Sequence, residues 1–250
     1  MKPNHLLLLS ILMNFFPSMS YRFTASKAGE KMKVKHMSLY QFNRVFVTSD
    51  IHGAYELLNQ LLDRIDLSSK DVLFILGDSC DRGRNTRKVY NTIRDLQQDY
   101  NVIHLMGNHE KMMIDALVHQ DNYMLWIFNG GQMTLKSYPE GKVFDHHLDY
   151  LQTLPYAIET SEYILVHAGI DPLKASIEEQ SPQTVLWTRM LMQPMKLATD
   201  KTVIFGHNIT PTGRITKVSS QQIAIDCGSY VYNRLGCLEL KSMKEIYVEK

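Results

Sequence analysis

Cysteine is scarce in this sequence. The 250 residues include only Cys80, Cys227 and Cys237, which follow no regular spacing. An odd number of cysteines at irregular intervals excludes a disulfide framework as the basis of the fold. The chain also lacks an excess of charge, because 27 basic and 26 acidic side chains leave a formal net charge of +1. We therefore expect no nucleic-acid partner and no stable membrane association through bulk electrostatic attraction.

The first forty residues lack an apolar run long enough to cross a bilayer, since Leu6–Phe16 is too short for a membrane-spanning helix. A basic residue before this run and small residues after it give the outline of a signal peptide. In a second interpretation, residues 28–31 are a translated ribosome-binding site, and Met32 or Met37 is a sufficient start. We favour the second interpretation, in which residues 1–40 are a disordered, over-extended start and the protein is cytoplasmic. Export is the alternative, if residues 1–20 are a genuine signal peptide.

Residues 41–250 are expected to form one domain, in which strands and helices alternate at first and short strands dominate later. Strand–helix–strand spacing favours parallel pairing through right-handed crossovers. Residues 110–151 form a longer insert that is mostly helical. In the first half, the predicted strands are 44–49, 72–76 and 102–106, and the predicted helices are 55–65 and 86–97. In the second half, the predicted strands are 156–159, 163–166, 202–205, 222–225, 235–240 and 245–248.

One apolar run ends at Gly77 and is followed by two acidic residues and an arginine within five positions: Asp78, Asp81 and Arg82. An apolar strand that gives way to a polar loop places the loop at the carboxyl edge of a sheet, where α/β folds bind ligands. Two neighbouring carboxylates repel each other unless a cation lies between them. Arg82 beside them would attract an anion. This stretch therefore indicates a metal and phosphate site, with a simple acidic turn as the alternative.

The same pattern, an apolar run followed by metal-ligating residue types, occurs at four other places in the chain. Oxygen and imidazole ligands together suit divalent ions such as Mn, Fe or Zn. Five such strand ends are difficult to explain by chance, so we expect them to deliver their side chains to one rim. The further strand-end residues are Asp50 and His52, Asn108 and His109, His167, and His207.

The ordered series DIHG, GDSCDRG, GNHE, HAG and GH resembles the phosphoprotein-phosphatase branch of the calcineurin-like metallophosphoesterases, and in particular its bacterial and phage-type serine/threonine phosphatases. The stretch WIFNGGQMTLKSY and the segment LWTR add to the resemblance, which runs from about residue 42 to about residue 240. It implies an α/β fold with two packed mixed sheets flanked by helices, a four-layer α/β/β/α sandwich. Residues 41–250 would then be the catalytic domain.

The resemblance also implies two divalent metal ions, Mn first and Fe or Zn as alternatives. Asp78 would bridge both ions. A hydroxide between the two metals would attack phosphorus directly, without a covalent phospho-enzyme. The first ion would be held by Asp50 and His52, and the second by Asn108, His167 and His207.

The remaining roles concern the leaving group and the phosphate. His109 would be the general acid, and Asp81 would orient its ring. Arg82, Arg189 and Asn108 would bind the phosphoryl oxygens. Other histidines have simpler interpretations: His104 is expected to be a buried, hydrogen-bonded strand residue, and His119, His146 and His147 are expected at the surface.

We expect the substrate to be phosphoserine or phosphothreonine in a phosphoprotein or phosphopeptide, with phosphotyrosine as a further candidate and a monomeric enzyme. The first alternative is symmetrical diadenosine tetraphosphate hydrolysis by a close relative of the same fold. That relative typically lacks the aspartate that Asp81 provides and carries proline where this chain has Arg84. The second alternative is a catalytically silent phosphopeptide-binding module. An intact Asp81 and His109 argue against it, because binding alone needs no proton donor.

Overall fold

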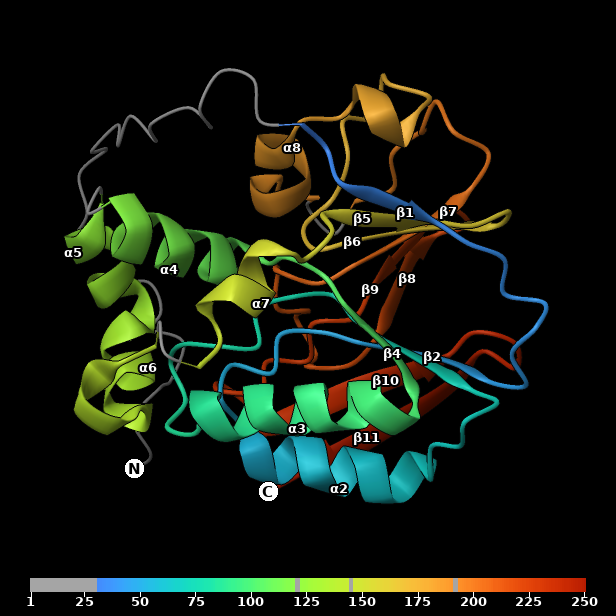
Figure 1. Cartoon of the computed structure of the whole chain (residues 1–250). Coiled ribbons are helices and arrows are strands. Elements are labelled where there is room, and N and C mark those ends of the chain that lie inside the picture. The colour runs from blue at the N-terminus through green and yellow to red at the C-terminus, as the bar shows by residue number, and fades with distance from the viewer. Residues whose placement is uncertain (1–30, 120–121, 144–145, 191–192) are drawn as a thin grey trace, which may run out of the picture. The chain divides into compact units, whose positions relative to one another are not determined.

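Two mixed β-sheets lie at the centre of the computed structural model, which describes residues 31–119, 122–143, 146–190 and 193–250 (Figure 1). In spatial order, the first sheet consists of β11 (Lys244–Glu249), β10 (Arg234–Glu239), β2 (Val45–Thr48), β3 (Val72–Ile75) and β4 (Asn101–His104). The second sheet, again in spatial order, consists of β1 (Val34–His36), β5 (Ala157–Glu159), β6 (Tyr163–Val166), β7 (Thr202–Phe205), β9 (Gln222–Ala224) and β8 (Thr216–Ser219).

The first sheet grows from two strand–helix–strand units, as the apolar spacing predicts. Strands β2, β3 and β4 pair in parallel, and helices α2 (Tyr55–Ile65) and α3 (Thr86–Asp99) connect them. Figure 1 shows both helices side by side along this sheet. Helix α2 buries Leu57, Leu58, Leu61 and Ile65, the positions that recur at helical spacing. This crossover geometry brings the carboxyl ends of the three parallel strands to one edge.

The two sheets pack face to face, which confirms the predicted sandwich. Alternate residues of one strand point to opposite faces, so Val45 and Val47 of β2 belong to one buried cluster and Phe46 to another. The cluster that contains Val45 and Val47 also contains Leu165 of β6 and Ile204 of β7, from the second sheet. These apolar contacts across the sandwich fix how the loops of one sheet face those of the other.

The insert after β4 is helical, as predicted. Trp126 in this insert is fully buried. Its elements are α4 (Asn108–His119), α5 (Tyr123–Trp126), the π-helical turn η1 (Ile127–Gly131), α6 (Gln132–Ser137), the 3-10 turn η2 (Pro139–Gly141) and α7 (Leu148–Gln152). Two short elements follow β6, namely η3 (Ile177–Glu179) and α8 (Pro182–Trp187).

Several features differ from the sequence prediction. Strand β1 lies within residues 31–40, which were assigned to the terminal segment, and it pairs in parallel with β5. Strand β8 was also missed, because its residues are only partly buried and show no apolar run. His147 was expected at the surface but is buried, with its Nδ1 2.8 Å from the Tyr138 hydroxyl.

The interpretations of the N-terminal residues as a signal peptide or as an over-extended start concern residues 1–30, which lie outside the described residues, so the cytoplasmic location stays a prediction. Within the part of the chain that the structure describes, no helix combines the length and the apolar character needed to cross a bilayer.

Candidate active site

Five loops that follow strands β2, β3, β4, β6 and β7 meet at one edge of the sandwich, and both sheets contribute to it. The structure brings all six predicted metal ligands together there, and five of them are at most 3% exposed. The sixth, His207, is partly exposed. The six residues are Asp50, His52, Asp78, Asn108, His167 and His207.

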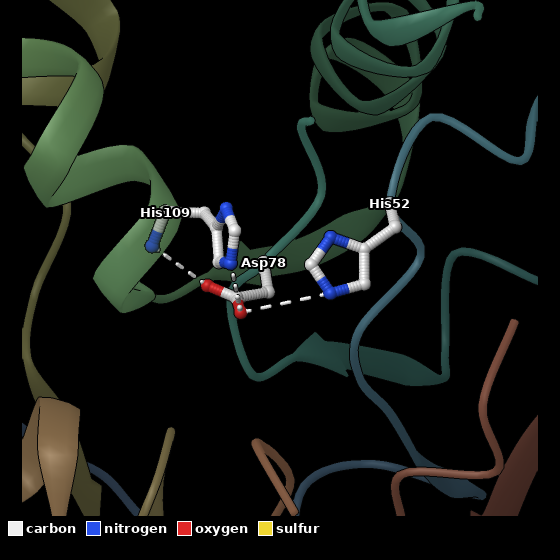
Figure 2. A group of neighbouring side chains, drawn as sticks. All are labelled: His52, Asp78 and His109. Atoms are coloured by element: carbon white, nitrogen blue, oxygen red, sulfur yellow. Dashed lines mark hydrogen bonds and ion pairs between the residues drawn. The ribbon is translucent and has the colours of Figure 1, made fainter. Parts of the chain in front are cut away.

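Asp78 lies at the centre of this group. Figure 2 shows its carboxylate between the rings of His52 and His109. The Asp78 Oδ2 atom is 3.7 Å from His52 Nε2, 3.9 Å from His109 Nε2 and 3.5 Å from His167 Nε2. One carboxylate oxygen therefore faces imidazole nitrogens from three different loops. This is the position expected of a ligand shared between two cations.

A second group of polar atoms also lies beside Asp78. The Asn108 Oδ1 atom is 2.8 Å from His167 Nε2 and 2.9 Å from His207 Nδ1. The two imidazole nitrogens are themselves 3.2 Å apart. At this site, two sets of three residues each have their candidate ligand atoms within 4.8 Å of one another. The sets are His52–Asp78–His109 and Asp78–His167–His207, and Asp78 belongs to both.

Backbone carbonyls fix how two of these rings point. The Nδ1 atoms of His52 and His167 lie 2.8 Å from the carbonyl oxygens of Cys80 and Leu76. A carbonyl only accepts hydrogen bonds, so each Nδ1 carries the proton and each Nε2 presents its lone pair to the centre. Burial lowers the pKa of His52 and of His167 below the ordinary value, which favours the neutral ring that binds metals.

Charge at the centre is unbalanced without a cation. Burial, followed by the charges of Asp50 and Glu110, raises the pKa of Asp78 well above its ordinary value. Burial, followed by the charges of His167 and Arg189, lowers the pKa of His207 to about 2. A divalent cation reverses this situation, because it favours the ionised carboxylate and coordinates the neutral imidazole. The mixed oxygen and nitrogen donor set therefore fits Mn, Fe or Zn.

Asp50 makes a contact between the two sheets. Its two carboxylate oxygens accept hydrogen bonds from the backbone amide of His207 at 3.2 and 3.0 Å. The contact joins the end of β2 in the first sheet to the end of β7 in the second. Asp50 thus ties the two halves of the site together, besides being a candidate ligand.

The loop backbones adopt a costly conformation here. Of the eleven described non-glycine residues with a positive φ, six belong to the site, including Asp50, Asp78 and His207. A left-handed backbone conformation destabilises the fold by an amount of order 1–3 kcal/mol per residue, and it persists where the surrounding contacts hold it in place. Gly77 shows how closely the loops pack, because a Cβ atom there would lie 2.5 Å from the backbone of Gly107.

His109 is held by a buried acid. Its Nδ1 atom is 2.7 Å from Asp81 Oδ2, and the Asp81 side chain is fully buried. The same carboxylate accepts hydrogen bonds from Trp126 Nε1 at 3.1 Å and from the Thr134 hydroxyl at 2.6 Å. The helical insert therefore supplies the donors that orient this acid. The sequence stretch that contains Trp126 and Thr134 carries the family resemblance, but it did not reveal this role.

Glu110 is a second residue whose role the sequence did not reveal. Its carboxylate accepts from the amides of Asp78 at 2.8 Å, Ser79 at 2.8 Å and Gly107 at 3.0 Å, and from the Tyr90 hydroxyl at 2.9 Å. Burial opposes its ionisation, but His104 and these donors lower the Glu110 pKa below the ordinary value. This one anion joins the loops after β3 and β4. The final letter of GNHE was the only signal for it.

The predicted phosphate-binding arginines occupy different positions. The Arg82 guanidinium lies over the site, with NH1 2.9 Å from His52 Nε2 and NH2 3.0 Å from His109 Nε2. Its Cζ atom is 4.4 Å from the centre of the Tyr230 ring. Arg189 is exposed, and its positive charge is one of the causes that lower the pKa of His207.

Residues 43–236 match the calcineurin-like phosphoesterase family, and this span covers most of the chain. The chain therefore belongs to that family of metal-dependent hydrolases. It is 30% identical over 218 residues to serine/threonine-protein phosphatase 2 of Salmonella typhimurium, across 80% of this chain and 94% of the relative. The Escherichia coli protein of the same name is 26% identical, across 84% of this chain and 98% of the relative.

A third relative points to other chemistry. The symmetrical bis(5'-nucleosyl)-tetraphosphatase of Chromobacterium violaceum is 28% identical over 134 residues, across 51% of this chain and 44% of the relative. Among solved structures, a serine/threonine phosphatase from Saccharomyces cerevisiae has a TM-score of 0.61 at 15% identity, covering 88% of this chain and 84% of that one. A candidate diadenosine tetraphosphatase has a TM-score of 0.65 at 20% identity, covering 87% and 97%. At these identities, the structural likeness shows the fold alone.

Replacing Glu110 with glutamine is expected to loosen the centre. Each oxygen of the carboxylate accepts two donors, so either orientation of the amide places an NH₂ group against N–H or O–H groups. We expect the free energy of unfolding to fall by about 1–3 kcal/mol and bound metal to be lost. Denaturant unfolding and metal analysis measure both, with the exposed Glu162→Gln as the control. Unchanged metal content would remove Glu110 from its positioning role.

Thr134→Val keeps the shape of the side chain but removes the hydroxyl that donates to Asp81 and accepts from its amide. With Asp81 less firmly held, we expect kcat to fall by about tenfold, the lower end of the range for an outer partner of a site residue. Thr134→Ser keeps the hydroxyl and is expected to stay near wild type. Steady-state kinetics on p-nitrophenyl phosphate compares the two variants, and equal losses would show that the hydroxyl is irrelevant.

Proposed function

We propose that this calcineurin-like phosphoesterase removes phosphate from phosphoserine and phosphothreonine in proteins. The observation that carries the proposal is the placement of His109, whose Nδ1 contacts Asp81 and whose Nε2 faces Asp78 and Arg82. A ring held in this way is suited to deliver a proton to the oxygen that leaves phosphorus. The relatives from Salmonella typhimurium and Escherichia coli, matched over almost their whole length, support the same substrate class.

Two divalent cations, proposed to be Mn, would supply the remaining chemistry: they would lower the pKa of a water molecule and offset charge on the phosphoryl oxygens. Asp78 would be shared between them. The proposed ligands of the first are Asp50 and His52, and those of the second are Asn108, His167 and His207.

Arg82 has a double task in this proposal. Its planar fork matches two oxygens of a phosphoryl group, but in the structure the fork donates to the Nε2 atoms of His52 and His109. Both nitrogens must be unprotonated to accept those bonds. As a proposed cation ligand, His52 needs the Nε2 lone pair that accepts from Arg82, so Arg82 would turn away from both rings to the phosphate and leave His109 Nε2 free to hold the proton that the leaving oxygen needs. Arg189 and Asn108 are proposed to contact the same phosphate.

The alternatives are less well supported. The tetraphosphatase relative from Chromobacterium violaceum matches only about half of this chain, and Asp81 and Arg84 depart from the pattern expected of that activity. A silent phosphopeptide-binding module would have no use for the buried His109–Asp81 pair, which costs desolvation and gives no additional contact to a bound phosphate.

A panel of substrates tests the proposal. With Mn²⁺, we expect the purified protein to hydrolyse phosphoserine and phosphothreonine peptides and p-nitrophenyl phosphate, with kcat/KM at least about tenfold above that for diadenosine tetraphosphate, a difference of 1.4 kcal/mol in barrier. Chelation should abolish every rate. A preference for diadenosine tetraphosphate would favour the alternative, and a rate that resists chelation would contradict the cation pair.

His109→Asn is expected to lower kcat by roughly 10²–10⁴, because the proton donor is lost. Bound metal should be retained. His109 Nε2 lies 3.9 Å from Asp78 Oδ2, so metal analysis is essential: lost ions would reassign His109 to the ligand set. The exposed His146 provides the control, since His146→Asn should leave kcat and metal content unchanged.

A further inference from the structure

Exposed apolar side chains are concentrated on two short segments of the described chain. Of the ten large apolar side chains that are exposed among the described residues, seven lie either between the end of α4 and η1 or in the loop before β10. Phe128 is 79% exposed and Met124 is 56% exposed, although an average aromatic ring prefers burial. The seven residues are Val118, Tyr123, Met124, Phe128, Tyr230, Val231 and Tyr232.

Both segments meet at the arginine that is proposed to bind phosphate. The centre of the Tyr230 ring is 4.4 Å from Arg82 Cζ, and this ring is nearly perpendicular to that of His52, with ring centres 5.3 Å apart. From the other segment, the Gly130 carbonyl accepts a hydrogen bond from the Arg82 amide at 3.3 Å. A Cβ atom on Gly130 would lie 2.9 Å from Arg82 Cγ, so this contact is close. Each of the two segments that carry exposed apolar residues thus contacts Arg82 at one position, Tyr230 or Gly130.

The length of a phosphoserine side chain decides what must touch these segments. Only Cβ and Oγ separate its phosphorus from Cα, so a phosphate held by Arg82 keeps the peptide backbone close to the site. Neighbouring residues of an extended peptide follow at about 3.3 Å intervals, with side chains that alternate in direction. The residues that flank the phosphorylated position would therefore lie near the two segments that contact Arg82.

We propose that Met124, Phe128, Tyr230 and Val231 form an apolar rim that binds apolar side chains next to the phosphorylated residue of a protein substrate. The inference rests on the proposed phosphatase activity and adds a substrate preference to it. Neither residues 123–131 (YMLWIFNGG) nor residues 229–233 (SYVYN) contain a charged side chain, so these segments offer no ion pair to a charged flank. Met124 adds an adaptable contact, which suits substrates of varied sequence.

Matched phosphopeptides test the rim. Two peptides of equal length carry phosphothreonine flanked on both sides by leucine in one and by lysine and glutamate in the other. For the wild type, we expect kcat/KM to be about tenfold higher for the leucine peptide, in line with burial of one or two apolar side chains. Phe128→Ser should bring this ratio close to one, whereas Phe128→Leu should retain most of it.

The control is Tyr40→Ser. Tyr40 is 83% exposed, similar to the 79% of Phe128. It precedes β2, whereas Asp50 and His52 follow β2, so it lies at the opposite end of that strand from the site. This variant should keep the full ratio. Hydrolysis of p-nitrophenyl phosphate reports whether each variant has an assembled site, and if Phe128→Ser does not fold, the same comparison with Met124→Ser decides.

Three results would overturn the rim. These are a wild-type ratio near one, an unchanged ratio in Phe128→Ser, and a dimer in light scattering that Phe128→Ser dissociates, since a dimer would assign the surface to a second copy of this chain. Failure of the phosphatase proposal has a different signature, because neither peptide would then be hydrolysed while diadenosine tetraphosphate was. Hydrolysis of both peptides with equal efficiency leaves the phosphatase intact and removes only the rim.

Discussion

One buried anion holds the centre of this site in place. The Glu110 carboxylate accepts hydrogen bonds from the amides of Asp78, Ser79 and Gly107, which belong to the loops after two neighbouring strands. These loops contain left-handed backbone at Asp78, a conformation that is unfavourable for a residue with a side chain. Three charge-assisted hydrogen bonds in a buried setting offset that cost. The position of Asp78, and through it the distance between the two groups of ligands, therefore depends on a residue that itself lies outside both groups.

The two sheets divide the work of building the site. The first sheet supplies Asp50, His52, Asp78 and Asn108 from parallel strands, while the second supplies His167 and His207. Apolar packing between the sheets sets their separation, and the contacts of Asp50 with the His207 amide fix their alignment at the edge. Neither sheet alone offers a complete set of oxygen and nitrogen donors. The packing of the sandwich is thus part of the chemistry of the site.

The sequence predicted those features that repeat locally. Each of the six ligand candidates follows an apolar run, and this pattern needs no knowledge of the tertiary structure. Trp126 and Thr134 were not assigned a role, because their value lies in reaching Asp81, about fifty positions earlier in the chain. Strand β1 was missed since an edge strand gains its stability from backbone pairing with β5, which leaves no apolar pattern in Val34–His36. His147 was misplaced because its partner, Tyr138, comes from another helical turn of the insert.

Arg82 joins catalysis to recognition. Its guanidinium donates to the Nε2 atoms of His52 and His109 and stacks on the Tyr230 ring, while its backbone amide donates to the Gly130 carbonyl. Because these partners already order the side chain, exchanging the two rings for a phosphate costs Arg82 little additional conformational freedom. Because of these contacts, an apolar substrate side chain that packs on Tyr230 or near Gly130 would also affect the position of Arg82, the proposed phosphate-binding residue. The residues that flank the phosphorylated position and the phosphate itself then both act on Arg82. Substrate specificity therefore affects turnover as well as affinity.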